Sequence, residues 1–92
     1  EIARWLEAQP RVKKVIYPPL ISDEGHRLWK RDFTGANGLL SFILDKDYAN
    51  DAVYRFVDKM KYFAIGASWG GFESLILRFD TRHRTATKWP HK

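Results

Sequence analysis

The chain has 92 residues, of which 45% are hydrophobic and 15% aromatic, and its formal net charge is +5. This length suits one small domain with a packed core, and the aromatic content argues against disorder. The chain contains no cysteine, which excludes a disulfide framework and a Cys-based metal site and predicts a cytoplasmic location. No apolar run approaches the ~20 residues of a membrane helix, so we expect no membrane partner.

The excess positive charge gathers at the end of the chain. Residues 82–92 contain no acidic side chain and carry the basic residues Arg82, Arg84, Lys88 and Lys92. A basic sheet face with exposed aromatic rings would suit a small nucleic-acid-binding module, and this function remains an alternative. Because the charge lies in the terminal segment, we interpret it as a solvated tail and expect no nucleic-acid partner.

A helix and a strand are the first predicted elements. Residues 2–8 have helical apolar spacing, and Pro10 ends this helix. Its apolar residues Ile2, Trp5 and Leu6 share one face by this spacing. Residues 12–17 are rich in β-branched side chains and alternate weakly, which predicts a short strand.

A short helix and a second strand are predicted next. Ser22 suits the N-cap of a helix over residues 23–31. Its acidic residues Asp23 and Glu24 would lie in the first turn and its basic residues in the last, as the helix dipole favours. After the glycine-bearing loop TGANG, residues 39–44 predict a buried strand.

The clearest helix signal covers residues 48–61, and Asp47 is placed to cap it. An apolar stripe along this helix predicts a core-facing side, and it comprises Ala49, Ala52, Val53, Phe56, Val57 and Met60. Residues 62–65 and 74–79 predict two further short strands.

The order of these elements predicts an α+β fold. Two strands that flank a crossover helix suggest a two-layer small domain, in which helices cover one face of a short, largely antiparallel sheet. We assign this domain to residues 1–80. Residues 81–92 lack periodicity and are expected to be a basic, loosely ordered tail that leads to a missing strand.

The stretch Ser68-Trp69-Gly70-Gly71 interrupts the strand pattern. Adjacent glycines are unfavourable in strands and indicate a tight bend or a close approach to another group. Such a bend could present backbone N–H groups to an anion. Glu73 could act as a general base or accept hydrogen bonds from the amides of the bend, and we favour the second role.

The sequence gives only weak evidence for a metal site or a catalytic nucleophile. The three histidines, His26, His83 and His91, lack ligand spacing, so no metal site is expected. Ser41 and Ser68 have no neighbouring base, and neither a GxSxG motif nor a Walker-type loop is present. Composition and spacing alone therefore predict only a tight turn with an aromatic wall at the rim of a small α+β domain.

Two longer stretches resemble a known family. WKRDFTGANGLLSFIL (Trp29–Leu44) and FAIGASWGGFESLIL (Phe63–Leu77) are similar to the carboxy-terminal domain of the pyridoxal-phosphate (PLP) enzymes of cysteine and methionine metabolism. VKKVIYPPL and GHRLWKR continue the resemblance, which covers roughly residues 1–80. Trp69 and the WKRDFTG run are most similar to the bacterial cystathionine β-lyases of that family. The resemblance implies a fold-type-I architecture, in which a large domain binds PLP through a lysine Schiff base.

The activity that the resemblance implies is that of a carbon–sulfur lyase, which cleaves cystathionine to homocysteine, pyruvate and ammonia in methionine biosynthesis and transsulfuration. The family's γ-lyases and γ-synthases remain alternatives, because Ala67 stands at a position that varies with substrate preference. The implied assembly is a homotetramer. The chain's first partner would be the missing PLP-binding domain, so the surface facing that domain should be unusually apolar.

The resemblance also implies a role for each residue of the bend. Ser68 and Trp69 match positions that line the substrate pocket near the amino-acid carboxylate, so we expect them to bind substrate. Gly70 and Gly71 would let the chain turn close to the ligand, and Glu73 would hold the turn.

Several family features are absent from the sequence. No lysine lies in a Ser-x-Thr-Lys context, and the phosphate-binding glycine loop and the ring-stacking tyrosine are missing. Arg78, Arg82 and Arg84 do not match the family's carboxylate-binding arginine. We therefore expect a piece truncated at both ends, with no catalytic residue, no bound PLP and no lyase activity of its own.

Overall fold

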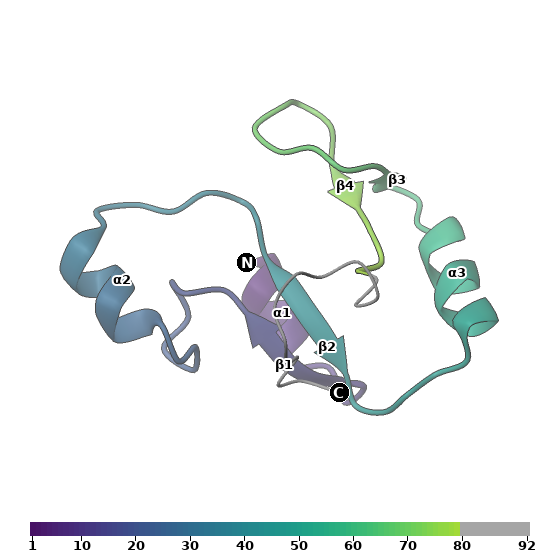
Figure 1. Ribbon diagram of the computed structural model, residues 1–92, viewed down its shortest axis with the longest axis horizontal. Helices are drawn as coiled ribbons and strands as arrows, with labels where there is room; N and C mark the ends of the chain where they lie inside the picture. Colours follow the sequence, from purple (N-terminus) through teal and green to yellow (C-terminus); the bar gives the residue numbers. More distant parts are fainter. Residues whose placement is uncertain (80–92) are drawn as a thin grey trace, which may run out of the picture. The chain divides into compact units, whose positions relative to one another are not determined.

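The computed structural model describes residues 1–79, and the predicted tail lies outside this range. Residue contacts divide the chain into two compact units, Glu1–Lys46 and Asp47–Lys92. Within residues 1–79 the elements follow one another in the order α1, β1, α2, β2, α3, β3, β4 (Figure 1). The predicted boundary at residue 80 coincides with the end of the described range and stays a prediction.

The first unit is built on a two-stranded antiparallel sheet. β1, Val12–Ile16, pairs with β2, Ser41–Leu44, and the register shifts between Val12 and Lys14. The helix α1, Ile2–Glu7, packs on β1 (Figure 1). The buried cluster consists of Ala3, Leu6, Val15 and Leu20, with Val12, Tyr17, Leu40 and Phe42 packed against it. Both predicted strands are confirmed, at shorter lengths.

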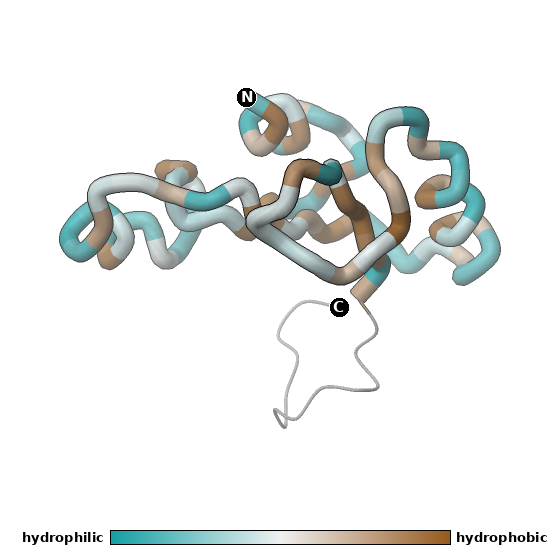
Figure 2. Tube along the Cα trace, turned by 90° about the horizontal axis from the view of Figure 1, so that it is seen from above, coloured by the Kyte–Doolittle hydropathy of each residue, from teal (hydrophilic) through white to brown (hydrophobic). Residues whose placement is uncertain are grey.

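α1 buries two of its residues against the rest of the first unit. Ala3 and Leu6 are buried, whereas Ile2 and Trp5 are 54% and 63% exposed. Brown and teal residues alternate along this helix beside the N label in Figure 2. Residues three apart lie on one helix face, so Ala3 and Leu6 turn inward together. Of the three apolar residues with helical spacing, Leu6 is therefore buried, whereas Ile2 and Trp5 are not.

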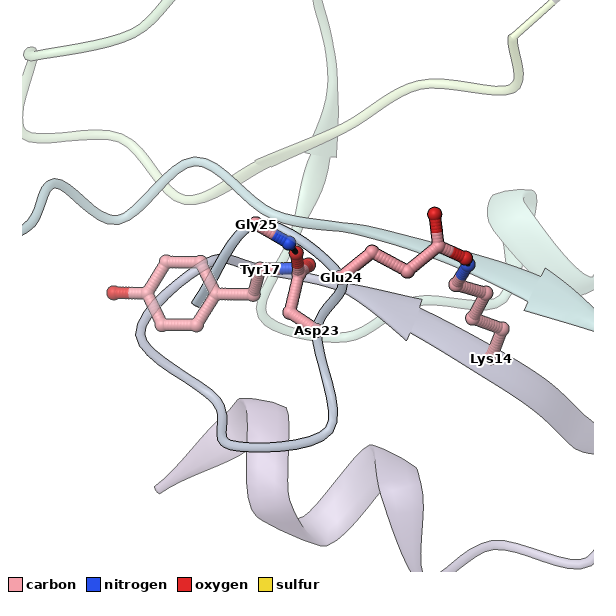
Figure 3. A network of polar contacts seen from close by, with 5 residues as sticks. All are labelled: Lys14, Tyr17, Asp23, Glu24 and Gly25. Atoms are coloured by element: carbon pink, nitrogen blue, oxygen red, sulfur yellow. Dashed lines mark hydrogen bonds and ion pairs between the residues drawn. The ribbon is translucent and has the colours of Figure 1, made fainter. Parts of the chain in front are cut away.

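The carboxylate of Asp23 organises the turn that follows β1. Its Oδ2 accepts a hydrogen bond from the Tyr17 N–H at 2.7 Å, and its Oδ1 accepts one from the Gly25 N–H at 2.7 Å (Figure 3). Beside it, the Glu24 carboxylate accepts a hydrogen bond from Lys14 Nζ at 2.7 Å. One acidic side chain thus satisfies two backbone amides, and its neighbour makes a more exposed ion pair.

The helix α2 covers His26–Asp32, and its N-cap is Gly25. The prediction that Ser22 caps this helix was wrong, and Asp23 and Glu24 do not lie in its first turn. The physical reason is that the Asp23 and Ser22 side chains bond other groups in place of the amides at the start of α2. The Asp23 carboxylate binds amides of the turn, and the Ser22 hydroxyl donates to a carboxylate oxygen of Glu7 instead.

Basic residues close α2, as predicted, and one of them pairs with the residue that follows it. Arg31 donates from Nε and Nη2 to the two carboxylate oxygens of Asp32 at 2.7 and 2.8 Å. This hydrogen bonding lowers the pKa of Asp32 and raises that of Arg31. The indole of Trp29 donates to the Gly35 carbonyl at 3.1 Å, which ties the helix to the TGANG loop.

The second unit contains α3, Asn50–Asp58, whose N-cap is Ala49 without a side-chain cap bond. The prediction that Asp47 caps this helix was therefore wrong, because the helix begins at Asn50, two residues later than a cap at Asp47 requires. The predicted apolar stripe is confirmed in part. Val57 is buried, whereas Phe56 is 46% exposed.

β3, Ala64–Ile65, and β4, Leu75–Ile76, complete the described elements and pair in parallel. The fold class is a small α+β fold, as predicted. The sheets differ from the prediction, because the described strands form one antiparallel and one parallel pair. The two-layer arrangement, with helices covering one face of a sheet, stays a prediction. No helix within residues 1–79 has the length and apolar character needed to span a membrane.

Candidate functional site

The candidate site is the segment of residues 66–74, which joins β3 to β4 and which we call the glycine loop. The Ala64 N–H donates to the Ser74 carbonyl at 2.9 Å, and the Gly66 N–H donates to the Ile76 carbonyl at 3.3 Å. These bonds hold the two ends of the loop side by side. The chain therefore leaves β3, bends, and returns to run parallel with it (Figure 1).

Glycine conformations shape this loop. Gly70 has a φ of 80°, in the left-handed region that residues with a Cβ rarely adopt. A Cβ on Gly66 would lie 3.1 Å from Leu75 Cδ2, so glycine lets the start of the loop pack against β4. A Cβ on Gly71 would meet Glu73 Oε2 at 3.7 Å, an ordinary contact. Gly70 is thus the residue at which the bend most depends on glycine.

The side chains of the bend are open to contact from outside the described residues. Ser68 is exposed, and the rings of Trp69 and Phe72 are 77% and 96% exposed. A hydroxyl beside an indole can donate and accept hydrogen bonds next to an apolar wall, which is a common combination in ligand pockets. Substrate binding by Ser68 and Trp69 stays a prediction, as do the structural roles of Gly70, Gly71 and Glu73.

An arginine that the motif analysis did not single out as functional fixes the chain just beyond the loop. Arg78 donates from Nη2 to Asn50 Oδ1 at 2.7 Å and from Nη1 to the Tyr54 hydroxyl at 3.1 Å. Its guanidinium carbon also lies 5.2 Å from the centre of the Tyr54 ring. The sequence feature that could have indicated these contacts is the four-residue spacing of Asn50 and Tyr54, which places them on one face of α3.

Histidine and carboxylate groups form no metal cluster within residues 1–79, where no group of three or more potential ligands comes together. His26 begins α2, and its Nδ1 lies 2.9 Å from the Pro18 carbonyl oxygen. Its ring centre is 5.5 Å from that of Trp29. His26 therefore has the structural environment expected for a polar helix position, and His83 and His91 lie outside the described residues.

A groove of about 350 Å³ lies in the first unit. It is lined by Glu7, Val12, Lys13, Lys14, Val15 and Ser22. Three of its four polar side chains already take part in contacts within the first unit, since the Ser22 hydroxyl donates to Glu7 and the Lys14 ammonium to Glu24. The groove therefore offers a weaker case for ligand binding than the glycine loop.

Comparison with known families identifies the chain. The family model described as "Cys/Met metabolism PLP-dependent enzyme" matches residues 1–89. The chain belongs to this family. The resemblance inferred from the motifs is thereby confirmed at the family level.

Individual relatives in this family differ in activity. The L-alanine/L-glutamate racemase of Wolbachia pipientis wMel is 50% identical over 82 residues, which cover 89% of this chain and 20% of the racemase. Cystathionine beta-lyase MetC of Escherichia coli (strain K12) is 42% identical over 88 residues, which cover 96% of this chain and 22% of the lyase. The chain thus spans about a fifth of the length of the curated relatives it matches.

A solved structure supports the same fold. Cystathionine gamma synthase from Xanthomonas oryzae pv. oryzae, in complex with cystathionine, superposes with a TM-score of 0.73 at 38% identity. The match covers 83% of this chain and 19% of that one. The small α+β arrangement is therefore an arrangement found in PLP-dependent enzymes of this family.

The described residues do not by themselves fit the cofactor of this family. A Schiff base needs an uncharged lysine amine, which burial favours because it disfavours the ammonium form. Every lysine within residues 1–79 is exposed or half-buried, and the half-buried Lys14 is ion-paired with Glu24. The Lys61 ammonium lies 5.6 Å from the centre of the exposed Tyr62 ring, which is also an open setting.

Proposed function

We propose that this chain is the substrate-side, C-terminal part of a PLP-dependent carbon–sulfur lyase of the cystathionine β-lyase type. The proposed reaction cleaves cystathionine to homocysteine, pyruvate and ammonia in methionine biosynthesis. The observation that carries the proposal is the exposed Ser68–Trp69 pair at a bend where Gly70 has a φ of 80°. The sequence identity of 42% to the lyase of Escherichia coli supports the same proposed activity.

The exposed groups of the bend define what they would do with a substrate. The Ser68 hydroxyl can donate a hydrogen bond to an amino-acid carboxylate, and the backbone N–H groups of the bend can do the same. The Trp69 indole can cover the apolar part of the substrate and exclude water from it. These contacts would orient the substrate, whereas the groups that change its bonds would come from the rest of the enzyme.

The exposed apolar surface supports a role as part of a larger enzyme. Within residues 1–79 the buried hydrophobic residues are only Ala3, Leu6, Val15, Leu20 and Val57. Large side chains such as Ile21, Tyr62 and Phe72 are at least 79% exposed. Apolar surface of this kind is characteristic of an interface, and we propose that the PLP-binding domain of the same protein covers part of it.

Racemisation is the second candidate activity, because the racemase of Wolbachia pipientis wMel is 50% identical to this chain. Lyase and racemase both act at the Cα of an amino acid, so a shared substrate-side domain is chemically reasonable. The γ-lyase and γ-synthase reactions remain alternatives, with Ala67 next to the substrate-binding pair. Family membership favours any of these over a basic nucleic-acid-binding module.

We further propose that the 92-residue chain alone binds no PLP and has no lyase activity. The open setting of the described lysines supports this proposal. The complete enzyme would use PLP and assemble as a homotetramer in the cytoplasm. If the isolated chain, mixed with PLP, developed a visible imine band that borohydride fixed onto one lysine, this part of the proposal would be wrong.

The decisive experiment uses the complete protein loaded with PLP. Pyruvate release from cystathionine is compared with the racemisation of L-alanine, and kcat/KM for cystathionine is expected to be higher. Trp69→Ala should raise the KM for cystathionine roughly tenfold, which corresponds to a lost contact of about 1.4 kcal/mol. Ser68→Ala should act in the same direction.

A matched control separates the glycine loop from the rest of the surface. Trp5 is 63% exposed, comparable to Trp69, but lies on α1. Trp5→Ala should leave the KM for cystathionine unchanged within about twofold. Equal effects at the two tryptophans would reject the substrate-binding role of Trp69. Racemisation without pyruvate release would reject the proposed lyase assignment.

A further inference from the structure

The second unit contains a polar connection between α3 and the chain that leaves β4. The Arg78 guanidinium bonds Asn50 Oδ1 at 2.7 Å and the Tyr54 hydroxyl at 3.1 Å, and it lies over the Tyr54 ring at 5.2 Å. Arg78 follows Ile76, the last residue of β4, by two positions. Three contacts to two side chains therefore hold the strand that ends the glycine loop.

The described strands of this part of the chain are short. β3 and β4 contain two residues each, and the Ala64 and Gly66 amides bond across them. Val57 is the buried hydrophobic residue of residues 47–79, and the strand residues Leu75 and Ile76 are half-buried. A parallel pair this short is weak by itself. The position of the glycine loop should therefore depend strongly on what fastens β4.

We propose that Asn50, Tyr54 and Arg78 form a clamp that positions the glycine loop for substrate. Arg78 acts as a positioning residue in this proposal, because its side chain acts on Ser68 and Trp69 only through β4. The proposal rests on the proposed function for the part that concerns substrate. The claim that the clamp fixes the loop stands on the contacts alone.

The clamp has the chemistry of a stable connection. A guanidinium is planar and always charged, so it can bond two acceptors while its face stacks on a ring. The acceptors Asn50 and Tyr54 are four residues apart on α3 and face the guanidinium together. A lysine at this position would keep the positive charge but lose the two fixed N–H donors and the planar face that stacks on the ring.

The test uses the complete, PLP-loaded protein and two readouts. The first is hydrogen–deuterium exchange of the Ala64 and Gly66 amides, whose acceptors lie at the two ends of β4. Arg78→Met should speed this exchange about threefold to tenfold, since one or two partly exposed hydrogen bonds are lost. Asn50→Ala should have a smaller effect in the same direction.

The second readout is the split between KM and kcat for cystathionine. A displaced substrate loop weakens binding, so Arg78→Met should raise KM about threefold to tenfold and leave kcat within about twofold. The double variant Asn50→Ala/Arg78→Met should be no worse than Arg78→Met, because both changes remove the same contact. Arg78→Lys should lie between the wild type and Arg78→Met.

Arg55 provides the matched control, because it is an exposed arginine on the same helix. Arg55→Met removes the same charge and should change neither readout. If exchange at Ala64 and Gly66 is the same in the Arg78→Met and Arg55→Met proteins, the clamp proposal is overturned, whatever happens to KM. If Tyr54→Phe, which keeps the ring, slows exchange at these amides, the proposal is also overturned.

The two proposals fail in different ways. A wild-type protein that does not act on cystathionine refutes the proposed lyase function, while faster exchange in Arg78→Met still supports the clamp. Faster exchange with an unchanged KM refutes the positioning role of Arg78. Exchange outside residues 47–79 serves as the check that each variant is folded.

Discussion

Replacement of Asp23 tests how the first unit is held together. The side chain accepts hydrogen bonds from the Tyr17 and Gly25 amides, both at 2.7 Å. Asp23→Ala leaves these two amides without their acceptor in a half-buried turn. Asp23→Asn keeps one good acceptor oxygen but loses the negative charge.

The expected loss follows from these two bonds. A hydrogen bond to a charged group contributes about 1.5–3 kcal/mol when it is well buried. Because Asp23 is only half-buried, we reduce each bond to about 1 kcal/mol. Asp23→Ala should therefore lower the free energy of unfolding by about 2 kcal/mol, and Asp23→Asn by about 1 kcal/mol.

Urea denaturation followed by far-UV circular dichroism measures this loss, with amide exchange of Gly25 as a local readout. Glu24→Gln is the matched control, because the neighbouring carboxylate pairs with Lys14 and is 82% exposed. An exposed pair of this kind contributes roughly 0.5 kcal/mol or less. If Asp23→Ala costs no more than Glu24→Gln, the two amide bonds do not stabilise the turn and the reasoning fails.

Two further predictions concern the bend and the end of α2. Gly70→Ala should destabilise the glycine loop by about 1 kcal/mol, because a Cβ is strained at a φ of 80°. Gly71→Ala should destabilise the loop by less than half as much. If both variants speed the exchange of the Gly66 amide equally, the special role of Gly70 in the bend is contradicted. Arg31→Gln should raise the pKa of Asp32 toward its ordinary value, because hydrogen bonding by Arg31 lowers it. The stability from this pair is present above the ordinary pKa and is lost as pH falls through the lowered one, and an NMR titration of the Asp32 carboxyl that shows no change would exclude Arg31 as the cause.

Local sequence signals predicted the type of every described element. The helix before Pro10, the two strands of the first unit and the helix of residues 50–58 all lie within predicted segments. Their lengths were overestimated, since strand propensity continues beyond the residues that find a pairing partner. β3 and β4 show this clearly, because only two residues of each predicted strand pair.

Two of the errors concern polar side chains that were predicted to cap helices. Ser22 and Asp47 are good N-caps by residue type, but neither caps a helix. Ser22 bonds Glu7, and Asp23 binds an amide six residues earlier in the chain. Such partners depend on how the chain folds back, which residue preferences do not specify.

The sequence by itself determined the order of helices and strands, the place of the glycine bend and the family, because these depend on neighbouring residues and on motifs. Tertiary structure alone decided which face of α1 is buried, which amides Asp23 binds, and that Arg78 meets Asn50 across 28 positions. Periodicity describes a single element, whereas these contacts arise only when two elements approach each other, and their geometry is set by packing.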